Sequence, residues 1–345
     1  MAKLSQAEVA KYLLKLKDSQ ESFLGFVRLQ YPDWELADFQ IELINTLDKL
    51  EKGILGKNNL LITMPPRHAK STFGTVLFPS YYMAKKPNRF TMSCSYNTQL
   101  STDFGRQIRG VVEQKNMTQA FKDFHLSKDS RAADVWRTES GGAYFAVGIG
   151  GTTSGRPANL LIVDDPIKSR EEAESMTQRN KTWNYYTSAL ATRLQPESDG
   201  TPPRQIVILT RWHVDDLAGR LMQTEDWQEG RWEHVNFPAI KEVTSGKMSR
   251  RMLPEDDPNY LTSEQYSKVS PAKRNISTTK QEPLWGERFP LDELKRRERL
   301  NPREFASLYQ QMPYVEGGNL IKTEWWQKFP EGLTPENFTT LVIGV

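Results

Sequence analysis

Three consecutive residues, Lys70, Ser71 and Thr72, have the types and the setting of a phosphate-binding site. They follow a short apolar run, the length of a buried strand, and a loop with two prolines that cannot continue a central strand. The residues after them suit a helix. In phosphate-binding loops of this order, backbone N–H groups and a helix N-terminus face the phosphates, the lysine neutralises them, and a hydroxyl group holds Mg²⁺.

The match to the pattern G-x-x-x-x-G-K-[ST] is imperfect, because Met64 and Ala69 occupy the two glycine positions. We expect Ala69 to be tolerated only if its φ stays negative, since a side chain disfavours positive φ. The alternative for the Lys-Ser-Thr run alone is an ordinary exposed helix.

Two aspartates, Asp164 and Asp165, follow the apolar run Leu160–Val163 further along the chain. A buried strand would deliver them to its carboxyl end, where Asp164 can hold Mg²⁺ and Asp165 can polarise an attacking water. The alternative is a turn that caps the next helix. The loop and the acidic strand together favour nucleotide hydrolysis.

A third apolar run, Val207–Leu209, ends in Thr210. A hydroxyl group at this position could report whether a γ-phosphate is present and so couple hydrolysis to movement. Many strands end in threonine for purely structural reasons, so a functional role for Thr210 is supported only by its occurrence together with the other two motifs.

The composition is that of an ordinary globular protein of 345 residues, with 37% hydrophobic and 26% charged residues. The net charge of +3 is nearly balanced, so contact with a polyanion would depend on local patches. The single cysteine excludes an internal disulfide framework, and the four histidines lack metal-ligand spacing. No apolar run is long enough for a membrane span and the N-terminus is too charged for a signal peptide, so we expect a soluble intracellular protein.

Short apolar strands alternate with helical stretches, which predicts an α/β fold with a mostly parallel sheet and helices on both faces. A polar stretch at 241–282 is expected to be a long exposed excursion. Strands are expected at 60–64, 89–95, 160–165 and 205–212, and helices at 6–30, 38–52, 97–109, 169–194, 215–222, 290–299 and 302–311.

Several segments together resemble one family, the large terminase subunits of tailed bacteriophages, the ATPases that package DNA into procapsids. They are Phe39-Gln40, MPPRHAKST, LLIVDDPIK, ILTRWHVDDLAGRL and PLWGERFPLDELKRRERLNPREFASLYQQMPYVEGG. The resemblance covers most of residues 35–345, and the last segment is its most specific part. It implies a P-loop nucleoside triphosphatase fold of the RecA-like, additional-strand type, with a small lid subdomain.

The resemblance also implies site residues. Gln40 would read adenine with Phe39 packed near the base, and Asp165 stands where the family usually has a catalytic glutamate. Thr210 would couple hydrolysis to movement, and Arg156 would reach a neighbouring subunit's ATP. The expected catalytic residues are Arg67, Arg156, Asp165 and Thr210; the expected nucleotide-binding residues are Phe39, Gln40, Pro66, Arg67, His68, Ala69, Lys70, Ser71 and Thr72; and the expected Mg²⁺ ligands are Ser71 and Asp164.

On this resemblance we expect an ATPase core at 1–235, a lid at 236–312, and a linker with the first strand of a nuclease domain at 313–345. That strand stops before a metal-binding aspartate, so no nuclease activity is expected from this chain. The implied activity is ATP-driven translocation of double-stranded DNA, by a homo-oligomeric ring that meets a portal protein and a small terminase subunit in the host cytoplasm.

Two alternatives stay open. A superfamily-2-like helicase or other DNA-stimulated ATPase shares the upstream glutamine, the loop and the acidic strand, but it needs a second RecA-like domain. A nucleotide-dependent scaffold would bind ATP without turnover, an alternative that the aspartate at position 165 keeps open.

Overall fold

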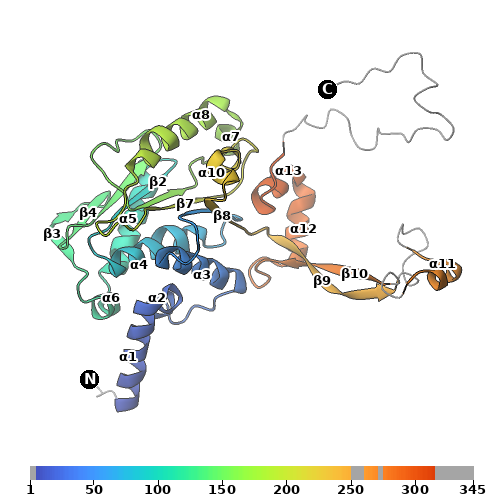
Figure 1. The fold of residues 1–345 in the computed structure, drawn as a ribbon, viewed down its shortest axis with the longest axis horizontal. Helices are drawn as coiled ribbons and strands as arrows, with labels where there is room; N and C mark the ends of the chain where they lie inside the picture. Colours follow the sequence, from blue (N-terminus) through green and yellow to red (C-terminus); the bar gives the residue numbers. More distant parts are fainter. Residues whose placement is uncertain (1–4, 250–259, 271–274, 315–345) are drawn as a thin grey trace.

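The core of the protein is an eight-stranded sheet, described here from a computed structural model that covers residues 5–249, 260–270 and 275–314 (Figure 1). The strand order is β3-β4-β5-β2-β6-β7-β1-β8, and every pairing from β5 to β8 is parallel. The strands are β1 (Asn59–Thr63), β2 (Phe90–Ser95), β3 (Leu126–Arg131), β4 (Val135–Thr138), β5 (Ala143–Gly148), β6 (Leu160–Asp164), β7 (Arg204–Leu209) and β8 (Trp232–Asn236).

The expected α/β fold with a mostly parallel sheet is therefore confirmed. The sheet has the P-loop order with an additional strand, because β7 lies between the loop strand β1 and the acidic strand β6. The pairings Leu61↔Val207 and Ile162↔Ile206 bring the carboxyl ends of the three strands to one edge. Ligands of open parallel sheets bind at this edge.

Both faces of the sheet are covered, because alternate residues of each central strand point to opposite sides. Leu60 and Ile62 pack into one core with α2, α3, α4 and α5, whereas Leu61 packs into the other with η2 and α9. The helical elements here are α1 (Gln6–Glu21), α2 (Phe23–Gln30), α3 (Asp38–Lys52), η1 (Thr72–Leu77), α4 (Phe78–Lys85), α5 (Thr98–Val112), α6 (Lys115–Ala120), α7 (Arg170–Glu174), α8 (Met176–Tyr185), η2 (Tyr186–Leu190), η3 (Ala191–Arg193), α9 (Leu217–Leu221) and α10 (Glu225–Gln228).

The structure interrupts the single helix expected at 6–30. Ser22 has an extended backbone, and its hydroxyl accepts the N–H of Gly25, so α2 begins with its own N-cap. Strands β3 and β4 were not expected from the sequence. They form an antiparallel edge, and β3 has the charged sequence LSKDSR, which lacks an apolar strand pattern.

The polar stretch at 241–282, expected as a long exposed excursion, contains a regular β-ribbon that the sequence did not predict. β9 (Ile240–Ser249) and β10 (Asn275–Pro283) form an antiparallel ribbon that projects from the sheet, with the short helix α11 (Ser263–Lys268) near its far end (Figure 1). Backbone pairing does not require apolar side chains, so a polar sequence can form such a ribbon. At its base lies a small core of Ala239, Ile240, Phe289, Leu294 and Phe305.

The chain continues from the ribbon into α12 (Leu291–Leu300), α13 (Pro302–Glu304) and η5 (Phe305–Tyr309), where helices were expected. The expected connector and final strand at 315–345 lie outside the described residues. Within the described ranges, no helix has the length and apolarity needed to cross a membrane.

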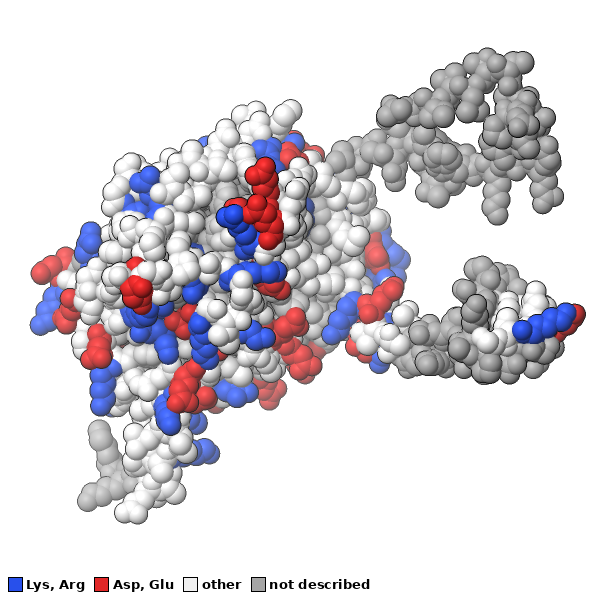
Figure 2. Space-filling view, viewed as in Figure 1, with Lys and Arg blue, Asp and Glu red and all other residues white. Residues whose placement is uncertain are grey.

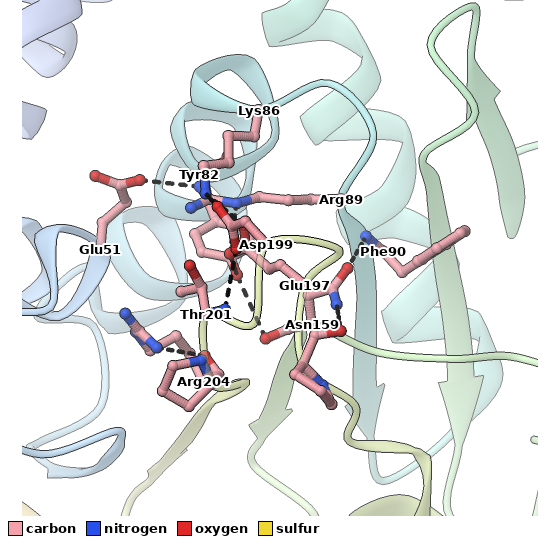
Figure 3. Close-up of polar contacts among 12 residues, drawn as sticks. Glu51, Tyr82, Lys86, Arg89, Phe90, Asn159, Glu197, Asp199, Thr201 and Arg204 are labelled. Atoms are coloured by element: carbon pink, nitrogen blue, oxygen red, sulfur yellow. Dashed lines mark hydrogen bonds and ion pairs between the residues drawn. The ribbon is translucent and has the colours of Figure 1, made fainter.

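The amino ends of the central strands meet at a buried ion cluster around Arg89 (Figure 3). Arg89 is 3% exposed, and its guanidinium donates to Glu51 and to Glu197, each at 2.9 Å. It also lies over the ring of Tyr82, 3.8 Å from the centroid. The cluster joins α3, α4 and the loop before β7 at the edge opposite the carboxyl ends.

We expect Arg89→Met to lower the free energy of unfolding by about 3–5 kcal/mol, because it leaves two buried carboxylates without their cation. Urea denaturation measures this loss. The matched control is Arg231→Met, since Arg231 is also paired with two carboxylates but is 60% exposed, and it should cost less than about 1 kcal/mol. An equal cost for both variants would contradict the structural role of the cluster.

Candidate functional site: a phosphate-loop cleft

The loop after β1 passes through the left-handed backbone region twice, at Arg67 (φ +63°) and Ala69 (φ +64°). The condition under which alanine would be tolerated here, a negative φ, is therefore not met. A side chain in this region costs roughly 1–2 kcal/mol, which the glycine of the usual pattern would avoid. The loop shape requires this turn whatever residue occupies it, so the strain persists beside the candidate site.

Lys70 lies at the centre of the site, buried where the carboxyl ends of β1, β6 and β7 meet. Its Nζ lies 2.8 Å from Oδ2 of Asp165 and donates to Oγ1 of Thr210 at 3.1 Å. Burial would lower the pKa of Lys70, but the nearby carboxylates of Asp165 and Asp164 outweigh it and raise this pKa. The lysine is thus held as a cation.

Asp165 is fixed by its backbone as well as by the lysine. It has φ +42°, its N–H donates to the carbonyl of Ile208 at 2.9 Å, and its Oδ1 accepts the N–H of Thr210 at 3.0 Å. Lys70, Asp165 and Thr210, which lie far apart in the sequence, are therefore joined by direct contacts.

Asp164 is buried, and its Oδ2 accepts a hydrogen bond from Oγ1 of Thr75 at 2.6 Å. Burial and the charge of Asp165 raise the pKa of Asp164 to about 6, although Lys70, Thr75 and Ser71 oppose this shift. Thr75 was not identified from the sequence. It lies in the π-helical turn η1, a type of turn that is frequent at functional sites.

The residues around Asp164 suit Mg²⁺. Oδ1 of Asp164 is buried and has no hydrogen-bond partner among the described residues, and the Ser71 side chain lies close enough to lower its pKa. The described residues contain no cluster of three or more His, Cys, Asp or Glu side chains that could hold a metal. Mg²⁺ in nucleotide sites needs only one or two protein ligands, because phosphate oxygens and waters complete its shell.

A cleft of about 500 Å³ lies next to the loop. Gln40 lies in its wall, and Oε1 of Gln40 accepts the N–H of Ala37 at 3.0 Å, which fixes the amide. Phe39 instead lies buried behind the cleft against Trp285 and Phe237. The cleft is lined by Asp33, Trp34, Glu35, Leu36, Gln40, Ala69, Thr72, Phe73, Trp285 and Arg288.

The sequence marked the segment 285–289 as distinctive but gave no reason to place it at this cleft, because only the tertiary fold brings it there. A second cleft, of about 330 Å³, adjoins Lys70. It is lined by Pro66, Lys70, Tyr96, Leu100, Asp165, Ile167, Lys168, Thr210, Trp212 and Leu308.

His68 packs into the protein rather than facing solvent. It is 1% exposed, its ring stacks on Phe289 with centroids 4.6 Å apart, and its Nδ1 lies 2.8 Å from the carbonyl oxygen of Pro66. Burial lowers the pKa of His68 to about 4, so the ring is neutral at pH 7. His68 therefore joins the loop to the segment that follows the ribbon.

Two expected catalytic residues make no direct contact with Lys70 within the described residues. Arg67 is exposed and forms no ion pair within the described residues. Arg156 lies over the ring of Phe145 on β5, 5.7 Å from the centroid. In the sheet order, β5 lies four strand spacings, about 19 Å, from the loop strand β1.

The buried histidine predicts a loss of stability in acid. Its folded pKa lies below the unfolded value near 6.5, so its contribution is complete above pH 6.5 and is lost as pH falls toward 4. Urea unfolding of the wild type should show this contribution decrease by about 2 kcal/mol between pH 7 and pH 5.

The control is His68→Phe, which keeps a ring against Phe289 but does not titrate. The stability difference between pH 7 and pH 5 should be smaller in this variant by that amount. Equal differences in both proteins would show that His68 is not buried as a neutral ring.

The chain was compared with known proteins. The family model described as "Terminase large subunit, T4likevirus-type, N-terminal" matches residues 61–328. A comparison with curated proteins finds no match.

Three solved structures are similar in part. The large terminase of bacteriophage HK97 is 13% identical, with a TM-score of 0.47 over 82% of this chain and 52% of that one. A mutant ATPase domain of the Thermus phage P74-26 large terminase is 11% identical, with a TM-score of 0.41 over 77% and 93%. A large terminase of a thermophilic bacteriophage in complex with ADP is 9% identical, with a TM-score of 0.34 over 59% and 46%.

This chain spans about half the length of the HK97 protein, 52% of it. The family match, by contrast, extends from β1 to beyond α13 and so includes the loop, both aspartates and the segment after the ribbon. Because it covers more than half of the sequence, the protein belongs to the family of terminase large subunits.

Proposed function

We propose that this chain is the ATPase part of a motor that translocates double-stranded DNA into a viral procapsid. The observation that carries the proposal is the direct contact of Lys70 with Asp165 and Thr210 at the carboxyl ends of adjacent strands. A cation, a carboxylate and a hydroxyl group beside a cleft are the parts that hydrolysis of a γ-phosphate requires. Membership of the terminase large subunit family supports viral DNA packaging as the process in which this ATPase acts.

Nucleotide would bind across the loop. The base would enter the cleft at Gln40, and Lys70 would exchange its contact with Asp165 for the β- and γ-phosphate oxygens. Ser71 and Asp164 would hold Mg²⁺, which supplies charge neutralisation at the phosphates when it is bound. Pro66, Arg67, His68, Ala69 and Thr72 would complete the loop around the phosphates, and Phe39 would support the cleft from behind.

Asp165 would act as the base that orients the attacking water. Once phosphate takes over Lys70, this carboxylate is free to accept a proton from water, and its left-handed backbone aims it away from the strand. Thr210 would respond when Lys70 and Asp165 exchange partners, because its hydroxyl accepts from Lys70 and its N–H donates to Asp165.

Arg156 would act on the ATP of a neighbouring subunit. It packs against β5, four strands from the loop strand in the sheet order, and it has no carboxylate partner within the described residues. An arginine supplied by a neighbour stabilises transition-state charge. This role requires a homo-oligomeric ring, which we propose as the working form.

DNA would be held mainly through its phosphates, since packaging must accept any sequence. Lys and Arg are interspersed with Asp and Glu over the face shown in Figure 2, so contacts would come from local groups of cations. We further propose a portal protein and a small terminase subunit as partners, and the host cytoplasm as the location.

The proposed division of the chain is an ATPase core at 1–235, a lid at 236–312, and a linker with the first strand of a nuclease domain at 313–345. The helicase alternative needs a second RecA-like sheet, whereas the part described between 236 and 314 holds a two-stranded ribbon and short helices. The non-hydrolysing scaffold remains the competing function, because Asp165 has a shorter reach than glutamate.

The first test is phosphate release from ATP, with and without double-stranded DNA, by the wild type and by Lys70→Ala. We expect turnover that DNA raises and that the substitution reduces at least a thousandfold, because the variant lacks the cation that binds the phosphates. Arg231→Ala, far from the loop on the surface, is the matched control and should keep wild-type turnover. ATP binding without turnover in the wild type would instead establish the scaffold.

The role of Arg156 predicts complementation between subunits. Lys70→Ala and Arg156→Ala should each be inactive alone, whereas their mixture should recover up to about a quarter of wild-type turnover, since some interfaces then pair an intact loop with an intact arginine. Turnover by Arg156→Ala alone, or a mixture no better than its components, would exclude action in trans.

A further inference from the structure

The end of β7 is held by two side chains from different parts of the chain. Beyond Leu209 the strand no longer pairs, yet the next two backbone N–H groups both have acceptors. Asp165 Oδ1 accepts the N–H of Thr210 at 3.0 Å, and Gln311 Oε1 accepts the N–H of Arg211 at 3.1 Å. The first acceptor belongs to the proposed site, but the second comes from the far end of the described chain.

Gln311 is held firmly in this position. It is 5% exposed, its Nε2 donates to the carbonyl of Leu308, and these two bonds fix which end of the amide meets Arg211. Its φ is +58°, an unfavourable conformation for glutamine. Residues held in such conformations cluster where geometry matters for function.

The helical segment that precedes Gln311 is itself anchored near the site. Arg170 on α7 pairs with Glu304 at 2.7 Å and also donates to the carbonyl of Trp212, in the same turn that follows β7. The turn after β7 is thus held by Arg170 on α7 and by Gln311 after η5. Of these two contacts, that of Gln311 is nearer to Thr210 in the sequence, because it is made to the next residue, Arg211.

We propose that Gln311 is a positioning residue for nucleotide hydrolysis, an inference that rests on the proposed function. By holding the peptide that follows Thr210, it keeps the Thr210 hydroxyl against Lys70 and the Thr210 N–H against Asp165. A change at the γ-phosphate then reaches the segment around residue 311 through this hydrogen bond, and a change in that segment reaches the proposed catalytic carboxylate by the same path.

The neighbouring Gln310 provides a matched control. It has the same side chain and lies at the same helix end, but its amide bonds to both backbone groups of Ile240, at 2.9 and 3.0 Å. It therefore anchors the helix to the start of the ribbon without touching the turn after β7. Equivalent substitutions at the two positions separate positioning from general anchoring.

The experiment compares Gln311→Met and Gln310→Met in steady-state ATP hydrolysis. For Gln311→Met we expect kcat to fall about tenfold with KM for ATP changed less than about twofold, since the loss of one hydrogen bond misplaces the catalytic turn but not the cleft. Gln310→Met should keep kcat within about twofold. Gln311→Gly relieves the backbone strain but also lacks the amide, so it should show the same fall in kcat.

Hydrogen exchange followed by mass spectrometry tests the positioning directly and does not need turnover. Exchange in peptides covering 206–214 and 64–72 should accelerate in Gln311→Met, and exchange near 240 should accelerate in Gln310→Met. If the wild type does not hydrolyse ATP, the proposed function fails. The hydrogen-exchange measurement still shows whether Gln311 positions the turn after β7.

Unchanged exchange at 206–214 in Gln311→Met would overturn the proposal. So would equal losses of kcat in the two methionine variants, or wild-type kcat in Gln311→Gly, because each would show that the amide does not position the turn.

Discussion

The contact between Lys70 and Asp165 is the interaction on which the arrangement of the site depends. Two opposite charges 2.8 Å apart at the end of a buried sheet are stable only if each stays paired, because an isolated charge there would carry a large desolvation cost. The lysine therefore stays with its carboxylate until another anion replaces it. A triphosphate is such an anion, so in the proposed function nucleotide binding would release the Asp165 carboxylate in the same step.

Backbone strain is concentrated around this contact. Four non-glycine residues have positive φ in the described chain, namely Arg67, Ala69, Asp165 and Gln311, and each belongs to the loop, the acidic turn or the clamp on the turn after β7. Such strain persists only where surrounding structure outweighs it. The two cores on the faces of the sheet and the ion cluster around Arg89 at the opposite edge supply that support.

The sequence predicted the central strands and the placement of Asp165 and Thr210 at strand ends near the Lys70 loop, because buried parallel strands are continuous apolar runs whose carboxyl ends meet at one edge. It did not predict the direct contacts among these three residues. It did not predict the ribbon, whose stability comes from backbone pairing and leaves no apolar pattern. Nor did it predict the positive φ of Ala69, since the shape of the loop, not the local preference of alanine, decides that angle. Contacts such as Phe289 with His68 depend on the fold and have no signal in spacing.

The segment after the ribbon contacts the site at two points. These two contacts limit how the segment and the site can move relative to each other. Phe289 stacks on His68 in the loop, and Gln311 accepts from Arg211 after β7. Phe289 belongs to a small core with Leu294 and Phe305, and Gln311 follows the helical turn that carries Phe305. A shift of the loop alone would therefore strain the His68 stack, and a shift of the turn after β7 alone would strain the Gln311 bond. The low-strain movement is one in which loop, turn and helices shift together. A local change at a phosphate would thereby become movement of the whole segment that leads out of the ATPase core.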